Sequence, residues 1–115
     1  MIQKDEKMMQ KAFKNQEGTE FYKHAFLLLQ NLFALRFLQQ FGQNIQTETD
    51  FTEKLKQLNI SLKADETQML QDIEMNYQLC QFGQSSCTCP QNLSAINNLM
   101  KKIKWKNSFF VSSLV

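Results

Sequence analysis

The chain has 115 residues, of which 43% are hydrophobic and 21% charged, and its formal net charge at pH 7 is +2. A chain of this length fits one domain and can bury a core of its own. Its 3 glycines and 1 proline supply few tight turns, which disfavours an all-β sandwich, and its modest charge disfavours a dedicated nucleic-acid binder.

The first predicted element is a short helix over residues 3–16. Its small apolar patch lies among lysines and contains Met8, Met9, Ala12 and Phe13. Gly18 is expected to end this helix, and Thr19 is expected to be the N-cap residue of the next one. Residues 1–18 are therefore treated as a short N-terminal helix or arm.

The next predicted helix covers about residues 20–41 and contains the most informative stretch of the chain. Within residues 25–38, only Gln30, Asn31 and Arg36 interrupt the apolar side chains. On a helix these apolar side chains point in every direction, and a helix that is apolar all round is buried all round. Because so short a chain has little material to wrap it completely, we expect part of its surface to bind another molecule.

Three more helices are predicted beyond Gly42, which is the expected left-handed cap of the long helix. They cover about residues 51–58, 65–80 and 92–105, and Asn59 is expected to end the first of them. Their apolar faces are formed by Phe51, Leu55 and Leu58, then Met69, Leu70, Ile73, Tyr77 and Cys80, then Leu93, Ile96, Leu99, Met100 and Ile103.

The predicted fold is all-α: a small single domain of four to five helices packed around the long apolar helix. Its core domain is expected over residues 19–106, followed by an apolar tail over residues 107–115. In the predicted helix over residues 65–80, we expect Glu66 to lie on the solvated polar face.

The surplus of aromatic and aliphatic side chains predicts a protein–protein interaction subunit, either an accessory or adaptor component of a larger assembly or a homo-oligomer. Large exposed apolar patches mark partner surfaces, and aromatic residues carry much of the binding energy of interfaces. The candidate partner-binding residues are Phe26, Leu29, Phe33, Phe37, Phe41, Phe109 and Phe110.

A second hypothesis, from another class, is binding to a nucleic acid or another anionic surface through residues 101–106. This segment contributes Lys101, Lys102, Lys104, Trp105 and Lys106, with no acidic residue nearby. Lysines can contact phosphates while an indole stacks on a base, and such binding weakens steeply with salt. The ordinary interpretation, a lysine-rich helix end with a packed tryptophan, is favoured over it.

The cysteines leave several alternatives open. Cys80, Cys87 and Cys89 can supply three metal ligands, but the spacing is not that of a zinc knuckle and the only histidine, His24, is far away in sequence. A disulfide from Cys80 to Cys87 or Cys89, redox exchange, or a simply buried Cys80 are the other possibilities. The cysteines and the sequons at Asn59 and Asn92 also suggest a weaker alternative, a secreted cytokine-like helical bundle.

No set of residues with a catalytic mechanism can be assembled, so we expect neither enzymatic activity nor a cofactor. His24 has no Ser, Cys or Asp at a telling offset. The charged N-terminal segment lacks the apolar run of a signal peptide, and the apolar run over residues 25–38 is too short and too polar for a transmembrane span. We therefore expect an intracellular protein, either cytoplasmic or organellar.

Overall fold

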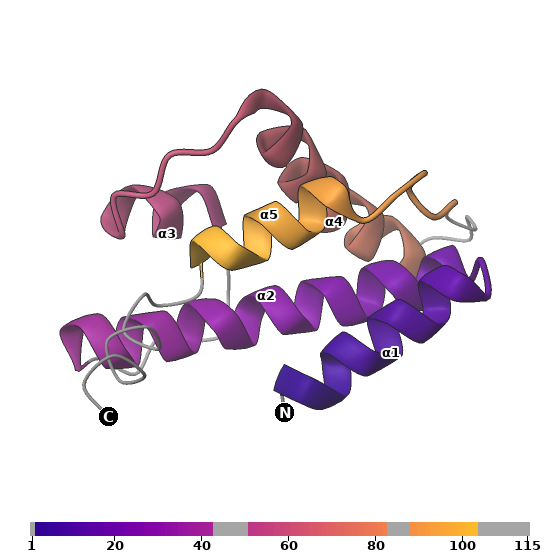
Figure 1. Ribbon diagram of the computed structural model, residues 1–115, viewed down its shortest axis with the longest axis horizontal. Coiled ribbons are helices and arrows are strands. Elements are labelled where there is room, and N and C mark those ends of the chain that lie inside the picture. The colour runs from indigo at the N-terminus through magenta and orange to yellow at the C-terminus, as the bar shows by residue number, and fades with distance from the viewer. Residues whose placement is uncertain (1, 43–50, 83–87, 104–115) are drawn as a thin grey trace.

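The computed structural model describes residues 2–42, 51–82 and 88–103, and these residues form five helices without a strand (Figure 1). The helices are α1 (Ile2–Lys14), α2 (Gly18–Phe41), α3 (Phe51–Gln57), α4 (Ala64–Phe82) and α5 (Ser94–Ile103). The predicted all-α fold class is therefore confirmed. In the same part of the chain, no helix combines the length and the apolar character needed to cross a membrane.

The longest of these helices is α2, with 24 residues. α1 turns back beside its N-terminal half, while α3, α4 and α5 lie over its other side (Figure 1). The C-terminal end of α2 projects beyond the start of α1 (Figure 1). The two halves of α2 therefore have different neighbours.

The turn between α1 and α2 differs from the sequence expectation. Gln16 has a left-handed backbone with φ 59°, and the Glu17 N–H donates to the Ala12 carbonyl at 2.8 Å, as at a Schellman helix end. Because the chain reverses at this point, α2 already begins at Gly18. The prediction that Gly18 ends the first helix and that Thr19 is the N-cap of the next is wrong. The N-cap residue is Glu17, and its side chain makes no capping hydrogen bond.

The ends of α2 and α3 follow the predicted signals. Gly42 is left-handed with φ 68°, and its N–H donates to the Leu38 carbonyl at 2.9 Å. Asn59 is left-handed with φ 58°, and the Ile60 N–H donates to the Leu55 carbonyl at 3.0 Å. Both ends are αL caps, which glycine and asparagine tolerate better than other residues.

One core joins side chains from all five helices. The predicted inward faces of α3, α4 and α5 supply most of their share, and α1 adds Met9 and Ala12. Phe51 of α3 packs against Phe26 and Phe33 of α2, with ring centroids 5.2 Å apart in each pair. The largest fully buried side chains include Phe21, Leu28, Leu29, Phe33, Phe51, Leu70, Ile73, Ile96, Leu99 and Ile103.

Candidate functional site

The candidate partner-binding residues differ in their exposure to solvent. Four of them, all on α2, are buried against this chain's own helices: Phe26, Leu29, Phe33 and Phe37. Phe41 is 46% exposed. Phe109 and Phe110 lie outside the described residues. Of the described candidates, only Phe41 is accessible to a partner without a change in the fold.

The wrapping of α2 explains why these aromatic residues are inaccessible. Phe26 stacks on Tyr77 of α4 with ring centroids 3.9 Å apart, and Phe33 stacks on Phe51 of α3. Buried aromatic pairs of this kind stabilise the fold beyond their burial of apolar area. The other helices therefore cover more of α2 than the sequence indicates.

The apolar surface that remains lies on the last two turns of α2. Leu35, Leu38 and Phe41 are 40%, 47% and 46% exposed. Their spacing of three residues places them along one side of the helix. We call these three residues the α2 end surface. Sequence reasoning found Phe41 but missed the two leucines, because a helix that is apolar all round does not show which side its neighbours leave open.

The position of α1 decides where this surface begins. Asp5 of α1 accepts a hydrogen bond from the Asn31 side chain at 3.2 Å, and only three residues of α1 come before it. Less than one helical turn of α1 can therefore extend past Asn31 toward the end of α2. Leu35 lies where the cover provided by α1 stops.

The α2 end surface is also free of exposed charge within its own stretch. Residues 35–42 contain no acid and no lysine, and their only charged residue is Arg36. Arg36 turns inward and is buried. An uncharged apolar surface can approach another apolar surface without desolvating an ion, which is the expensive step in burial.

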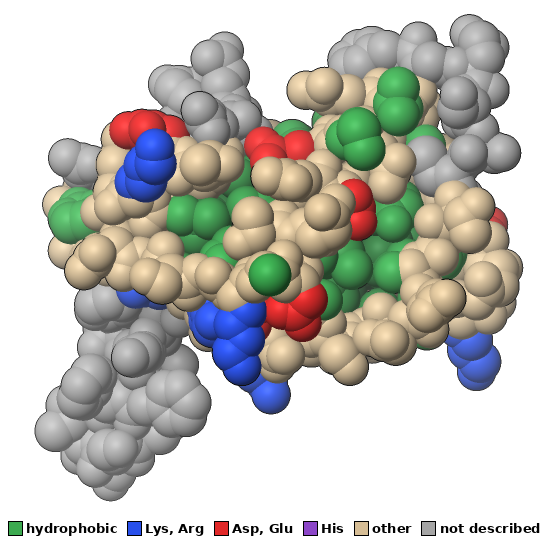
Figure 2. All heavy atoms as spheres, turned by 90° about the horizontal axis from the view of Figure 1, so that it is seen from above, with side chains coloured by type: hydrophobic (Ala, Val, Ile, Leu, Met, Phe, Trp, Pro, Cys, Tyr) green, Lys and Arg blue, Asp and Glu red, His purple; other side chains and the backbone are tan. Residues whose placement is uncertain are grey.

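Other large exposed apolar residues do not share this setting. Met75 and Leu79 are exposed on α4, but Asp72, Gln71 and Gln78 surround them on the same side of that helix. On the face seen in Figure 2, hydrophobic side chains show mainly in the gaps between polar ones. Leu79 is 47% exposed, the same fraction as Leu38, which makes it a matched control for the α2 end surface.

Lys102, a candidate for anion binding, is engaged within the fold. Its Nζ atom lies 2.6 Å from Oε1 of Glu66, and it is 33% exposed. Lys101 is exposed, while Lys104, Trp105 and Lys106 lie outside the described residues. On the face shown in Figure 2, the described Lys and Arg side chains lie at separate places rather than in one patch.

The prediction of a solvated Glu66 is wrong. Its side chain is only 1% exposed, and its carboxylate bonds to groups at the start of α4 and in the last turn of α5. It accepts the Lys63 N–H at 2.9 Å, which satisfies a free donor at the start of α4, and it pairs with Lys102 of α5. These two hydrogen bonds, the Lys102 bond first, hold the pKa of Glu66 below its ordinary value.

Arg36 of α2 caps the C-terminal end of α5 and so connects these two helices. Its Nη1 donates to the Lys102 carbonyl at 3.2 Å and to the Ile103 carbonyl at 2.8 Å, and its Nε donates to Gln40 at 2.9 Å. A cation at a helix C-terminus satisfies free carbonyls and opposes the helix dipole. The residue that interrupts the apolar run thus has a structural role, and its burial lowers its pKa.

The cysteines also differ from the simplest expectation. Cys80 is disulfide-bonded and only partly buried, so it is not merely an apolar core residue. Cys89 is a buried free thiol, which excludes a Cys80–Cys89 bond. Burial is the main cause that raises the pKa of the Cys89 thiol, and the negative charge of Glu17 adds to it. A raised pKa disfavours the thiolate that redox exchange needs. Cys87 lies outside the described residues. Among the residues that the structure describes, no group of three or more His, Cys, Asp or Glu side chains could hold a metal ion.

His24 lies between two carboxylates rather than beside a nucleophile. Its Nδ1 is 3.2 Å from Asp5 Oδ1, and its Nε2 is 3.4 Å from Glu20 Oε2. The contact with Asp5 and the Asn31–Asp5 hydrogen bond join α1 to α2, whereas the contact with Glu20 lies within α2. The observed partners give His24 a role in positioning α1.

Comparison of the chain with protein-family models, with curated proteins and with solved structures finds no match. The function is therefore inferred from the geometry of the chain itself.

Proposed function

We propose that this chain is a small helical protein–protein interaction subunit that docks through the α2 end surface. The observation that supports this most is the clustering of Leu35, Leu38 and Phe41, each 40–47% exposed, at the end of a helix that is otherwise well covered. Grouped apolar exposure marks interaction sites, whereas single exposed apolar residues are ordinary.

The partner we propose is a second copy of the chain. Residues 35–42 carry no charge other than the inward-turned Arg36, so the side chains of this surface can meet those of a second copy without like charges of their own. Lys54 of α3, whose ammonium lies over the Phe37 ring at 5.4 Å, is a cation beside this stretch. An antiparallel pairing about a twofold axis would place Leu38 near its own counterpart and would oppose the two helix dipoles. Stable interfaces use about 20–30 residues a side, so contact through these few side chains gives a weak dimer.

Replacing Leu38 with glutamate is expected to keep the protein monomeric. The wild-type mass should rise with protein concentration and should change little with salt, because apolar contact is not screened. In Leu38→Glu a dimer would bury two carboxylates close together, which is strongly unfavourable. Light scattering over a concentration series at low and high salt measures both effects.

Leu79→Glu is the matched control for this experiment. It adds the same charge at an equally exposed leucine on α4, and it should dimerise as the wild type does. A wild-type protein that stays monomeric at every concentration would contradict the proposal. So would a loss of dimer in Leu79→Glu equal to that in Leu38→Glu.

The disulfide at Cys80 favours a second candidate, a helical bundle that works in an oxidising compartment. Disulfides persist in secreted proteins and in oxidising organelles and are rare in the reducing cytosol. The secreted cytokine-like bundle and the organellar alternative share this property. The buried free thiol of Cys89 is compatible with either of them.

Titration of thiols in the purified protein tests the state of the cysteines. Without reductant, the denatured chain should show fewer than three reactive thiols, because a disulfide removes sulfur from the count. In the folded protein, Cys89 should react at least about tenfold more slowly than in denaturant, since labelling requires local opening. Three thiols that react rapidly in the folded protein would refute both expectations.

A further inference from the structure

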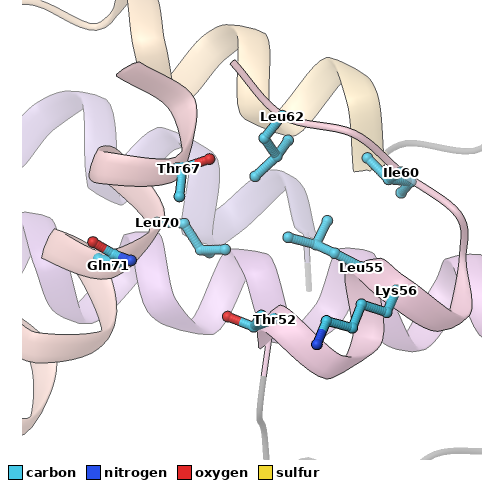
Figure 3. Close-up of a pocket in the computed structure, with 8 residues that line it drawn as sticks. All are labelled: Thr52, Leu55, Lys56, Ile60, Leu62, Thr67, Leu70 and Gln71. Carbon is cyan, nitrogen blue, oxygen red and sulfur yellow. The ribbon is translucent and has the colours of Figure 1, made fainter. Parts of the chain in front are cut away.

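A cavity of about 200 Å³ lies between α3, the segment that follows it, and the first turns of α4 (Figure 3). Leu55, Leu62 and Leu70 point toward one another and form its apolar floor (Figure 3). The cap at Asn59 explains part of this shape, because a Schellman turn brings the residue after the cap, here Ile60, against the helix it ends.

The edge of the cavity is polar. It is formed by the side chains of Thr52, Lys56, Thr67 and Gln71. Thr52 and Lys56 are one turn apart on α3, so the hydroxyl and the ammonium group share one edge (Figure 3). Among the described residues, no hydrogen bond or ion pair engages these four side-chain groups.

Among the described residues that line the cavity, Lys56 is the only charged one. Farther out, α3 and the segment after it carry Lys54, Lys56 and Lys63 against Glu53, and the first turn of α4 carries Asp65 and Glu66, of which Glu66 is paired with Lys102. Lys54 lies over the Phe37 ring at 5.4 Å, which leaves Lys56 as the cation at the cavity edge. An ammonium beside hydroxyl groups is a suitable donor set for a carboxylate.

We infer that this cavity binds a small amphipathic carboxylate, with its alkyl or single-ring body on the leucine floor and its carboxylate at Lys56 and Thr52. The size supports this class of ligand, since an apolar cavity of about 150 Å³ is enough to hold benzene. An apolar pocket with a few convergent polar groups is also the usual form of a small-ligand site. This inference does not depend on the α2 end surface.

Titration with octanoate, followed by amide NMR shifts, tests the inference. We expect saturable shifts confined to α3, the segment after it and α4, with a dissociation constant of roughly 1 mM or lower. Octanol, which has the same chain without the charge, should bind more weakly. Absence of saturable binding, or equal binding of octanoate and octanol, would overturn the carboxylate assignment.

Three variants localise the binding. Thr67→Phe, at an exposed position of α4, should fill the cavity and abolish the octanoate shifts. Lys56→Met should weaken octanoate binding about fivefold and leave octanol binding unchanged. Lys54→Met, on the same helix but directed at the Phe37 ring, should bind octanoate as the wild type does. Octanoate binding that survives Thr67→Phe unchanged, with the variant folded by its NMR spectrum, would overturn the assignment to this cavity.

Discussion

Replacing Phe33 with alanine is expected to lower the free energy of unfolding by about 4 kcal/mol, whereas the same change at Phe41 lowers it by less than about 1 kcal/mol. Both residues are phenylalanines of α2, but Phe41 is its last residue, where helix propensity has less effect than in the interior. Phe33 is fully buried against Phe51, and its removal leaves a cavity. Phe41 is half exposed at the helix end and loses little packing.

Urea denaturation of the two variants and the wild type measures this difference. Because weak dimerisation adds to apparent stability, the measurements belong at a protein concentration where the wild type is monomeric. Similar small losses in both variants would mean that α2 does not bury Phe33 as described. Similar large losses would mean that Phe41 belongs to the core rather than to the α2 end surface.

The second large effect is expected at the pair formed by Glu66 and Lys102. Lys102→Met should lower the free energy of unfolding at pH 7 by about 3 kcal/mol, because it leaves a buried carboxylate without its counter-charge. Glu66→Gln should cost less, because Lys102 is 33% exposed and can reach water. The double variant Glu66→Leu, Lys102→Met should recover part of the loss, since neither charge is then buried.

The pH dependence follows from the lowered pKa of Glu66. The folded-state pKa lies below the unfolded-state value of about 4.3, so Glu66 stabilises the wild type above that value. This contribution is lost as the pH falls through the lower, folded-state pKa. Lys102→Met removes the first cause of the lowering, so its deficit relative to the wild type should shrink between pH 7 and pH 3. A deficit that stays constant with pH would mean that the pair does not hold Glu66 ionised.

Local signals in the sequence were enough to predict much of the fold. The apolar repeats of α3, α4 and α5 gave their inward faces, and Gly42 and Asn59 marked helix ends because a left-handed residue is a local requirement. The start of α2 could not be predicted in the same way. The left-handed position there falls on Gln16, a residue type without a strong preference for it.

Long-range polar contacts could not be predicted from the sequence. Arg36 and the carbonyls it caps are 66 and 67 residues apart, and Glu66 and Lys102 are 36 residues apart. No periodic pattern connects such positions, so Glu66 resembled a solvated residue and Lys102 a surface cation. Both assignments depend on where α5 ends relative to α2 and α4.

The candidate docking surface could not be located from the sequence for the same reason. The sequence showed that α2 has more apolar surface than one stripe requires, but not which residues its neighbours leave uncovered. That depends on the length and position of α1, which Asp5 and Asn31 reveal only in the folded chain. The sequence therefore does not indicate Leu35 and Leu38, and it favours aromatic residues that the fold buries.

Hydroxyl-radical footprinting of the side chains of α2, at low and at high protein concentration, tests whether the α2 end surface is the part of this helix that docks. We predict that Phe33 and Phe37 are protected at both concentrations, and that Leu38 and Phe41 are modified at low concentration and protected at high concentration. Modification of Phe33 or Phe37 in the dilute protein, or modification of Leu38 and Phe41 that does not change with concentration, would contradict the proposed surface.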